Sequence, residues 1–427
     1  MGGGAVKRPN ILLLYADQWR GDALGCAGDP VVQTPALDRL ASTGLHLPST
    51  FTVDPVCTPS RAALLTGRYP HVTGVTHNDL RLPEHEVAFA QVFAAAGYRT
   101  GYIGKWHLDG EEKPGFVPPG PRRHGFEYWA AFNRGHAYHA PVYYRDRDEP
   151  IASDRYEPDL QTDLACDFLE ADDPRPFCLV VAWGPPHTPL QPPARTAGRY
   201  RPQDMPLPPS VPPAEAQRSQ SERARYYGLV TSLDDNVDRL LRTLDRLGAA
   251  SDTMVCFTAD HGDLLGEHGL YRKGMPQEPS IRVPLLLRWP ERIQTGVQAG
   301  VCVASVDLCP TLLGLAGLPA PAGVQGRDLS AWLTGMAPAP DDPVYIEGRL
   351  GAPDEWRALR TARHLIAVSA ASGETTHLFD LEQDPHQLRN LARDPDAAHL
   401  RRGLWRRLAA AAAATADRPP LQPPDIG

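Results

Sequence analysis

The chain has 427 residues, of which 43 are Lys or Arg and 51 are Asp or Glu, and its formal net charge is −8 at pH 7. This length is sufficient for one large core and a smaller second domain. The acidic balance excludes the electrostatic footprint of a nucleic-acid-binding protein, so we expect no nucleic-acid partner.

The seven cysteines have no paired spacing and form no C-x-x-C motif. The sequence therefore predicts neither a disulfide framework nor a zinc knuckle, and a reducing compartment fits best. The apolar run at residues 11–15, which follows Lys7 and Arg8, is too short for a signal sequence, and no later run is long enough to span a bilayer. We expect a cytoplasmic protein without a membrane partner.

Buried strands and helices alternate along the first three quarters of the chain. Four apolar segments, each followed at once by polar or charged residues, are typical of strands: 11–15, 99–104, 177–183 and 253–258. Helical spacing or capping signals mark the segments between them: 34–44, 57–67, 86–97 and 221–248. This alternation predicts a doubly wound α/β domain with helices on both faces, in which ligands bind beyond the carboxyl ends of the strands.

Residues 111–150 are rich in Pro, Gly and aromatic residues, and we predict no regular element there. This segment contains Asn133, Arg134, His136 and His139, which makes it a candidate insertion facing the substrate.

The last part of the chain has a different pattern. A helix at 307–316 precedes a Pro-rich joint at 337–343. Short strands near 344–347, 359–368 and 375–380 and a helix at 401–414 come next. We therefore predict two domains, 1–339 and a small α+β domain with an antiparallel sheet at 340–427.

The stretch CTPSRAALLTG, from Cys57 to Gly67, combines a thiol, a turn and a cation. Thr58 has the character of a helix cap with Pro59 in the first turn, and Gly67 is a C-cap. Cys57 is thus expected just outside a helix N-terminus, where an anion is favoured, and Arg61 points back to the same place.

This stretch resembles the sulfatase signature C-x-P-S-R-x-x-x-L-T-G at every fixed position. A buried structural cysteine beside a capped helix would not require Pro59, Ser60, Arg61 and the Thr66-Gly67 ending together. The resemblance implies the alkaline-phosphatase-like fold with a large mixed sheet. It also implies that Cys57 is oxidised to formylglycine by a formylglycine-generating enzyme, a partner during maturation.

Asp17, Asp260 and His261 follow strands whose ends converge, and acids packed together repel one another unless a cation lies between them. The resemblance likewise implies a divalent metal ion held by Asp17, Cys57 as formylglycine, Asp260 and His261. Gln18 departs from the common Asp-Asp pair, as in choline sulfatases and phosphonate monoester hydrolases, and is a weaker ligand or none. Oxygen ligands favour calcium or magnesium, and His261 also admits manganese.

Four further residues match the family's motifs: Lys105 and His107 in G-K-W-H-L, His187 in P-P-H-x-P, and Lys273 after D-H-G-x-x-L-G-E-H-G. The resemblance implies that one hydroxyl of the hydrated formylglycine attacks sulfur to form a covalent sulfate ester. His187 or Lys273 then protonates the leaving alcohol, and His107 takes the proton of the second hydroxyl, which releases sulfate. Arg61 and Lys105 hold the diol.

The sequence thus predicts a sulfatase whose small sulfated substrate is an alkyl ester, with a carbohydrate as the expected alcohol. A phosphonate monoester or phosphodiester hydrolase on the same fold is the first alternative, although the intact Lys105-Trp106-His107 argues against it. A protein that binds a sulfated ligand without catalysis is the second.

Overall fold

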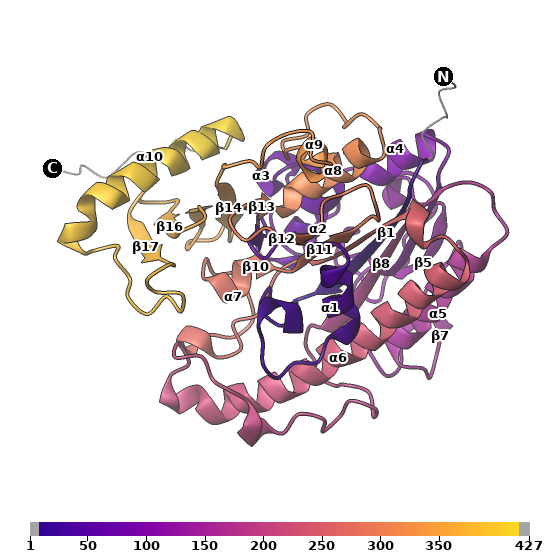
Figure 1. Ribbon diagram of the computed structural model, residues 1–427, viewed down its shortest axis with the longest axis horizontal. Coiled ribbons are helices and arrows are strands. Elements are labelled where there is room, and N and C mark those ends of the chain that lie inside the picture. The colour runs from indigo at the N-terminus through magenta and orange to yellow at the C-terminus, as the bar shows by residue number, and fades with distance from the viewer. Residues whose placement is uncertain (1–7, 418–427) are drawn as a thin grey trace.

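The computed structural model describes residues 8–417. An eight-stranded sheet with the order β12-β2-β11-β9-β1-β8-β4-β5 forms its centre (Figure 1). The strands of this sheet are β1 (Asn10–Asp17), β2 (Leu45–His46), β4 (Arg99–Lys105), β5 (Tyr128–Phe132), β8 (Phe177–Pro186), β9 (Thr253–Ala259), β11 (Leu285–Arg288) and β12 (Gly296–Val297). Strands β9, β1, β8, β4 and β5 run parallel, whereas β11 is antiparallel to both of its neighbours. The predicted large mixed sheet is confirmed.

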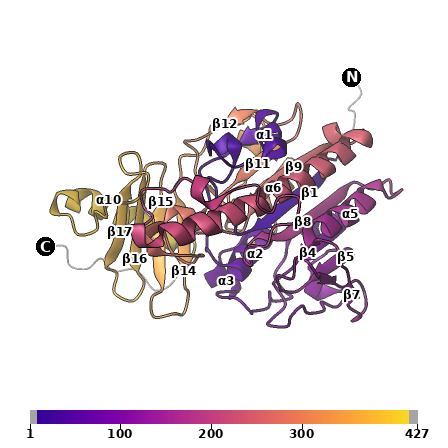
Figure 2. The ribbon, with the colours of Figure 1, turned by 90° about the horizontal axis from the view of Figure 1, so that it is seen from below.

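Side chains of β1 alternate between two buried layers because successive residues of a strand point to opposite faces. Ile11, Leu13 and Tyr15 pack into the core on one face, and Leu12 and Leu14 pack into the core on the other. The first face is covered by α2 (Cys57–Thr66), α4 (Phe89–Ala95), α8 (Leu308–Leu315) and α9 (Ser330–Leu333). The second face is covered by α1 (Pro35–Ser42), α5 (Glu157–Glu170) and α6 (Ala216–Arg246), as Figure 2 shows for α5 and α6.

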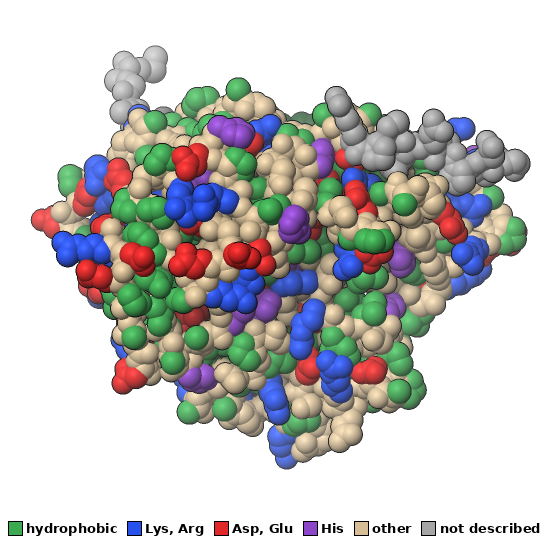
Figure 3. Space-filling model, turned by 180° about the vertical axis from the view of Figure 1, so that it is seen from behind, with side chains coloured by type: hydrophobic (Ala, Val, Ile, Leu, Met, Phe, Trp, Pro, Cys, Tyr) green, Lys and Arg blue, Asp and Glu red, His purple; other side chains and the backbone are tan. Residues whose placement is uncertain are grey.

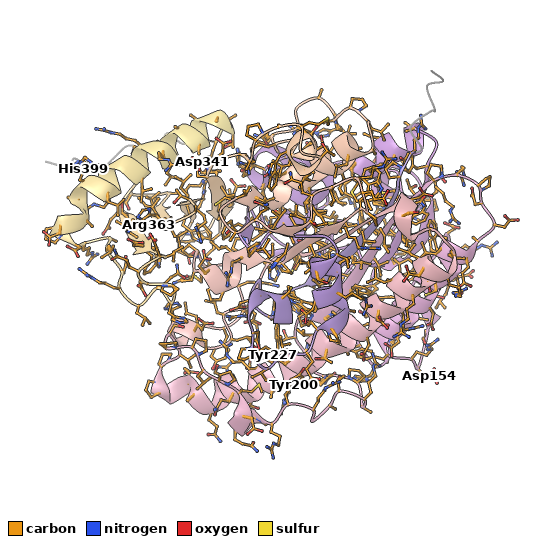
Figure 4. The ribbon with its side chains drawn as sticks, in the orientation of Figure 1. Asp154, Tyr200, Tyr227, Asp341, Arg363 and His399 are labelled. Atoms are coloured by element: carbon orange, nitrogen blue, oxygen red, sulfur yellow. The ribbon has the colours of Figure 1, made fainter. Side chains whose placement is uncertain are left out.

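Two smaller sheets and several short helices lie around this centre. One sheet pairs β10 (Arg282–Val283) and β13 (Val303–Ala304) with β3 (Thr50–Phe51), and the other pairs β6 (Val142–Tyr143) with β7 (Ile151–Ala152). The short helices are α3 (Pro70–Thr73) and α7 (Glu278–Ile281). Near the long helix α6, the rings of Tyr200 and Tyr227 meet edge to face at 5.7 Å (Figure 4).

The C-terminal part lies to one side of the large sheet (Figure 1). Its antiparallel sheet has the order β14-β15-β16-β17, with helix α10 (Ala398–Ala414) packed on it. The strands are β14 (Val344–Gly348), β15 (Trp356–Arg360), β16 (His364–Ser369) and β17 (Thr375–Asp380). The predicted antiparallel sheet is confirmed, and the boundary at 339/340 remains a prediction.

The structure corrects four local predictions. Residues 128–132 form β5, a strand of the large sheet, although 111–150 is predicted without regular elements. Residues 359–368 are not one strand, because a turn at 361–363 separates β15 from β16. Helix α5 is not predicted, and α6 begins five residues before the predicted start at 221.

Over the described residues, no helix is long and apolar enough to cross a membrane. Lys, Arg, Asp and Glu side chains are interspersed over the face shown in Figure 3.

Candidate active site

The carboxyl ends of four parallel strands bring polar side chains to one edge of the sheet. Asp17 is the last residue of β1 and Lys105 is the last residue of β4. His187 follows β8, and Asp260 follows β9. Strands β9, β1, β8 and β4 are neighbours in this order, so these four side chains come from adjacent strands. The predicted convergence of strand ends therefore holds.

Helix α2 presents Cys57 to this edge. The helix begins at Cys57 itself, so the prediction that Thr58 is the cap and Cys57 lies outside the helix is wrong. The Thr58 hydroxyl instead donates to the carbonyl of His107 at 3.0 Å, and the Thr58 N–H donates to Asn78 Oδ1 at 3.0 Å. Gly67 ends the helix in the left-handed region with φ of 68°, as predicted.

Four donor atoms from Asp17, Cys57, Asp260 and His261 all lie within 4.8 Å of one another, and all four residues are buried. The Cys57 sulfur is 3.3 Å from His261 Nε2 and 3.8 Å from Asp17 Oδ1. His261 Nδ1 lies 2.9 Å from the carbonyl of Gly262. Since a carbonyl only accepts, Nδ1 carries a proton, and Nε2 is the ring nitrogen that faces the cluster.

This donor set fits a divalent cation. Two buried carboxylates and a histidine nitrogen converge, and the Cys57 sulfur occupies the place that an oxygen of formylglycine would take. Without a cation, the carboxylates repel each other: burial and the charge of Asp17 raise the pKa of Asp260.

Gln18 turns its amide oxygen toward the site. Its Nε2 donates to Asp263 Oδ2 at 2.6 Å, and its Oε1 accepts from Lys273 Nζ at 3.2 Å. The backbone of Gln18 has φ of 68°, a conformation that costs energy for a residue with a Cβ, and its N–H donates to Asp260 Oδ1. The amide oxygen is thus held against Lys273 Nζ, which in turn contacts the Cys57 sulfur.

Three cations enclose the carboxylates and the thiol. Lys105 Nζ is 2.6 Å from Asp17 Oδ2, and Lys273 Nζ is 2.9 Å from the Cys57 sulfur. Arg61 bridges the two acids, with its NH2 atom 3.1 Å from Asp17 Oδ2 and 3.2 Å from Asp260 Oδ2. As predicted, Arg61 points back from α2 to the place that Cys57 occupies.

These cations decide the charge of the groups they surround. Burial raises the pKa of Asp17, but Lys105 and Arg61 outweigh it and hold the pKa well below its usual range. Burial and Asp17 raise the pKa of the Cys57 thiol, yet Lys105, Lys273 and His261 bring it well below the usual value. The site is built to stabilise an anion at residue 57 and beside it.

The other two histidines that the sequence predicts at the site, His107 and His187, are neutral at pH 7. Burial and Lys105 lower the pKa of His107 to about 4, and burial and Lys273 lower the pKa of His187 to about 3. His187 Nδ1 is 2.6 Å from the carbonyl of Thr188, which fixes the proton on Nδ1. Its Nε2 is therefore the atom left to exchange a proton with a ligand.

The structure adds residues to which the sequence gave no individual role. Asn78 binds the first turn of α2, and Asp79 Oδ1 is 3.8 Å from His107 Nε2 and pairs with Arg134. His136 Nε2 is 3.5 Å from Lys105 Nζ. Arg134 and His136 lie in the segment predicted to face the substrate, whereas nothing in the local pattern of residues 78 and 79 indicates proximity to Cys57.

The chain matches two family models: sulfatase over residues 9–318, and N-sulphoglucosamine sulphohydrolase, C-terminal, over residues 266–414. It is 38% identical to an ulvan-active sulfatase of Formosa agariphila, over 93% of this chain and 80% of that protein. It is 33% identical to arylsulfatase A of Homo sapiens, over 91% and 84% of the two chains. The crystal structure of yidJ from Bacteroides fragilis is 31% identical, covers 98% of each chain and has a TM-score of 0.90. The chain therefore belongs to the sulfatase family, with its alkaline-phosphatase-like fold, and is a sulfuric ester hydrolase.

Proposed function

We propose that the chain hydrolyses an alkyl sulfate ester, with a carbohydrate as the alcohol, by means of a formylglycine made from Cys57 by a formylglycine-generating enzyme. The observation that carries this proposal is the position of the Cys57 sulfur between Lys273 Nζ at 2.9 Å and His261 Nε2 at 3.3 Å. Any nucleophile at residue 57 would act at the point where cations and metal ligands meet.

Hydrated formylglycine at residue 57 would supply two hydroxyls on one carbon, one to attack sulfur and one whose deprotonation releases sulfate. A divalent ion held by Asp17, residue 57, Asp260 and His261, with the amide oxygen of Gln18 beside them, would stabilise the attacking oxygen as an anion. Calcium or magnesium suits the oxygen ligands, and manganese also suits His261.

The surrounding side chains divide the remaining tasks. Lys105 and Lys273 neutralise the sulfate oxygens, and Arg61 keeps the two carboxylates oriented. His107, whose pKa is about 4, is neutral and is able to accept the proton of the second hydroxyl.

The proton for the leaving oxygen comes from His187 Nε2 in this proposal. Without substrate, the pKa of His187 is about 3, because burial and Lys273 disfavour the imidazolium. A bound sulfate group brings negative charge next to the ring and raises this pKa, so the proton is present when the leaving group needs it. Lys273 is the second candidate donor.

A comparison of two substrates with different leaving groups tests the proposal. A sugar alkoxide needs a general acid, whereas 4-nitrophenolate hardly does, and general-acid assistance is worth about 10²–10⁴ in rate. We expect His187→Ala to lose far more kcat on a sugar sulfate, chosen by screening sulfated monosaccharides, than on 4-nitrophenyl sulfate. Equal losses would assign His187 to sulfate binding. A wild type faster on phosphonate monoesters than on every sulfate would contradict the substrate class.

A further inference from the structure

His136 lies in the loop that follows β5 and faces two of the residues to which the proposed function gives roles. Its Nε2 is 3.5 Å from Lys105 Nζ, at the long end of the hydrogen-bond range. Its Nδ1 is 3.1 Å from the hydroxyl of Tyr138. Its ring lies 3.9 Å from the ring of His187, and the two planes are only 6° apart.

The carbonyl oxygen of His187 determines which atoms donate in the chain of hydrogen bonds through Tyr138 and His136. The Tyr138 hydroxyl lies 2.8 Å from the carbonyl oxygen of His187, which only accepts, so Tyr138 donates to it. The Tyr138 oxygen is then free to accept from His136 Nδ1–H. In this tautomer, the lone pair of His136 Nε2 points at the ammonium group of Lys105.

The charge state of His136 agrees with this arrangement. Burial and Lys105 lower the pKa of His136 far below its usual range, so the ring is neutral at pH 7. A neutral ring is able to accept from Lys105 and to stack on His187 without repulsion between two cations.

Lys105 and His187 are both restrained through this one ring. The Lys105 ammonium already binds Asp17 Oδ2 at 2.6 Å, and the lone pair of His136 binds a second side of it. The ring of His187 is held by its Nδ1 contact with Thr188 and by the stack on His136. Displacement of such catalytic side chains by about 1 Å lowers the reaction rate about 10²-fold.

We propose that His136 is a positioning residue that fixes the Lys105 ammonium and the His187 imidazole toward the sulfate group. This inference rests on the proposed function, since it takes the roles of Lys105 and His187 from there. His136 itself exchanges no proton with the substrate.

Two variants separate the two contacts. His136→Phe keeps a flat ring for the stack but removes the acceptor that faces Lys105. His136→Gln keeps an acceptor on a side chain of similar length but removes the ring. His399→Ala is the control, because His399 is exposed on α10 in the C-terminal part of the chain, away from the strand ends that form the site (Figure 4).

Each enzyme is assayed, after melting curves have established its folding, on 4-nitrophenyl sulfate and on the sugar sulfate, with His187→Ala in parallel. We expect His136→Phe to raise KM at least tenfold on both substrates, because the Lys105 ammonium is less well held. We expect His136→Gln to lower kcat at least tenfold more on the sugar sulfate than on the aryl sulfate. His399→Ala should stay within twofold of the wild type.

The inference is overturned if both His136 variants match His399→Ala, or if their losses follow a fall in melting temperature and are the same on both substrates. Equal losses of His187→Ala on the two substrates would contradict the proposed general acid and, with it, the part of the inference that concerns His187. A KM effect of His136→Phe would still support the Lys105 contact in that case.

Discussion

At the scale of single residues, the site is a balance between buried anions and cations. Asp17, Asp260 and an anion at residue 57 would repel one another in a space closed to water, and Arg61, Lys105 and Lys273 offset most of that repulsion. A divalent ion between Asp17, Asp260 and His261 would complete the balance, so binding of such an ion should couple to folding.

Metal removal is the first prediction. A ligand that binds only the folded state stabilises it by about 2.7 kcal/mol at a concentration of 100 Kd. Chelation should therefore lower the melting temperature of the wild type and abolish turnover. The variant His261→Ala, which lacks one ligand, should show a much smaller shift on chelation. If the wild type kept its melting temperature and its activity in the chelator, the metal site would be wrongly assigned.

How far the sequence predicted the site depends on where each residue lies. Asp17 and Lys105 could be placed because they end apolar strands, and Cys57 because a complete motif surrounds it. Asp79 was not predicted at the site, and His136 was predicted only as part of a substrate-facing segment, because loops bring both to the site and no periodicity fixes the path of a loop.

At the scale of elements, helix α5 begins with an acid, Glu157, that contacts the loop carrying His136. Glu157, the first residue of α5, is buried, and its N–H donates to the carbonyl of Tyr138 at 2.7 Å. Burial raises the pKa of Glu157 to about 8 and outweighs the hydrogen bonds from Gln161 and the Gly184 N–H. The folded protein therefore keeps this carboxyl protonated at neutral pH.

The pH dependence of stability follows from this shift. Between pH 4.5 and about pH 8 the unfolded chain loses the Glu157 proton while the folded chain keeps it, so stability falls as pH rises through this window. The full shift corresponds to about 5 kcal/mol. Glu157→Gln should be more stable than the wild type in urea unfolding at pH 8.5, and should lose most of this advantage at pH 5.

The control for this prediction is Glu170→Gln at the other end of α5, where the carboxylate is exposed and pairs with Arg246. Its effect should be small at both values of pH. An advantage of Glu157→Gln that is the same at pH 5 and pH 8.5 would contradict the raised pKa.

Elements were predicted well where apolar runs are long and poorly where they are short or lie among turns. Strand β5 is a five-residue run, YWAAF, inside a segment rich in Pro and Gly, and the surrounding turn signals hid it. Helix α5 has its signal at Leu160, Leu164 and Phe168, with helical spacing, so it could have been predicted.

At the scale of the whole molecule, a buried junction joins the C-terminal sheet to the helices around Cys57. His71 Nδ1 is 2.5 Å from Glu347 Oε2 on β14, and His71 Nε2 is 3.0 Å from the carbonyl of Thr415 just beyond α10. Burial lowers the pKa of His71, but Glu347 outweighs it and raises the pKa, which favours an imidazolium with both contacts satisfied. His71 thus connects α3 with two elements of the C-terminal part.

We expect His71→Ala to destabilise the protein by about 3–5 kcal/mol, because it removes the imidazolium that pairs with the fully buried carboxylate of Glu347 and leaves only the N–H of residue 71 bound to it. His399→Ala is the control, since His399 is exposed on α10 at the edge of the molecule (Figure 4). Denaturant unfolding measures both variants. Similar small effects of the two would show that this junction does not hold the C-terminal sheet in place.

The fold class followed from the alternation of strands and helices, but the order of the strands did not. The antiparallel strand β11 has no pattern that distinguishes it from a parallel one, and β2 and β12 have two residues each. Such short strands are fixed by tertiary contacts rather than by local propensity.

The central claim is that residue 57 acts as formylglycine, and peptide mass spectrometry combined with turnover tests it most directly. Protein produced with and without a co-expressed formylglycine-generating enzyme should differ in the fraction of residue 57 in which oxygen has replaced sulfur. The account predicts that kcat on 4-nitrophenyl sulfate rises in proportion to this fraction and that Cys57→Ala remains inactive although folded. Full activity in protein whose residue 57 is entirely an unmodified thiol would contradict it.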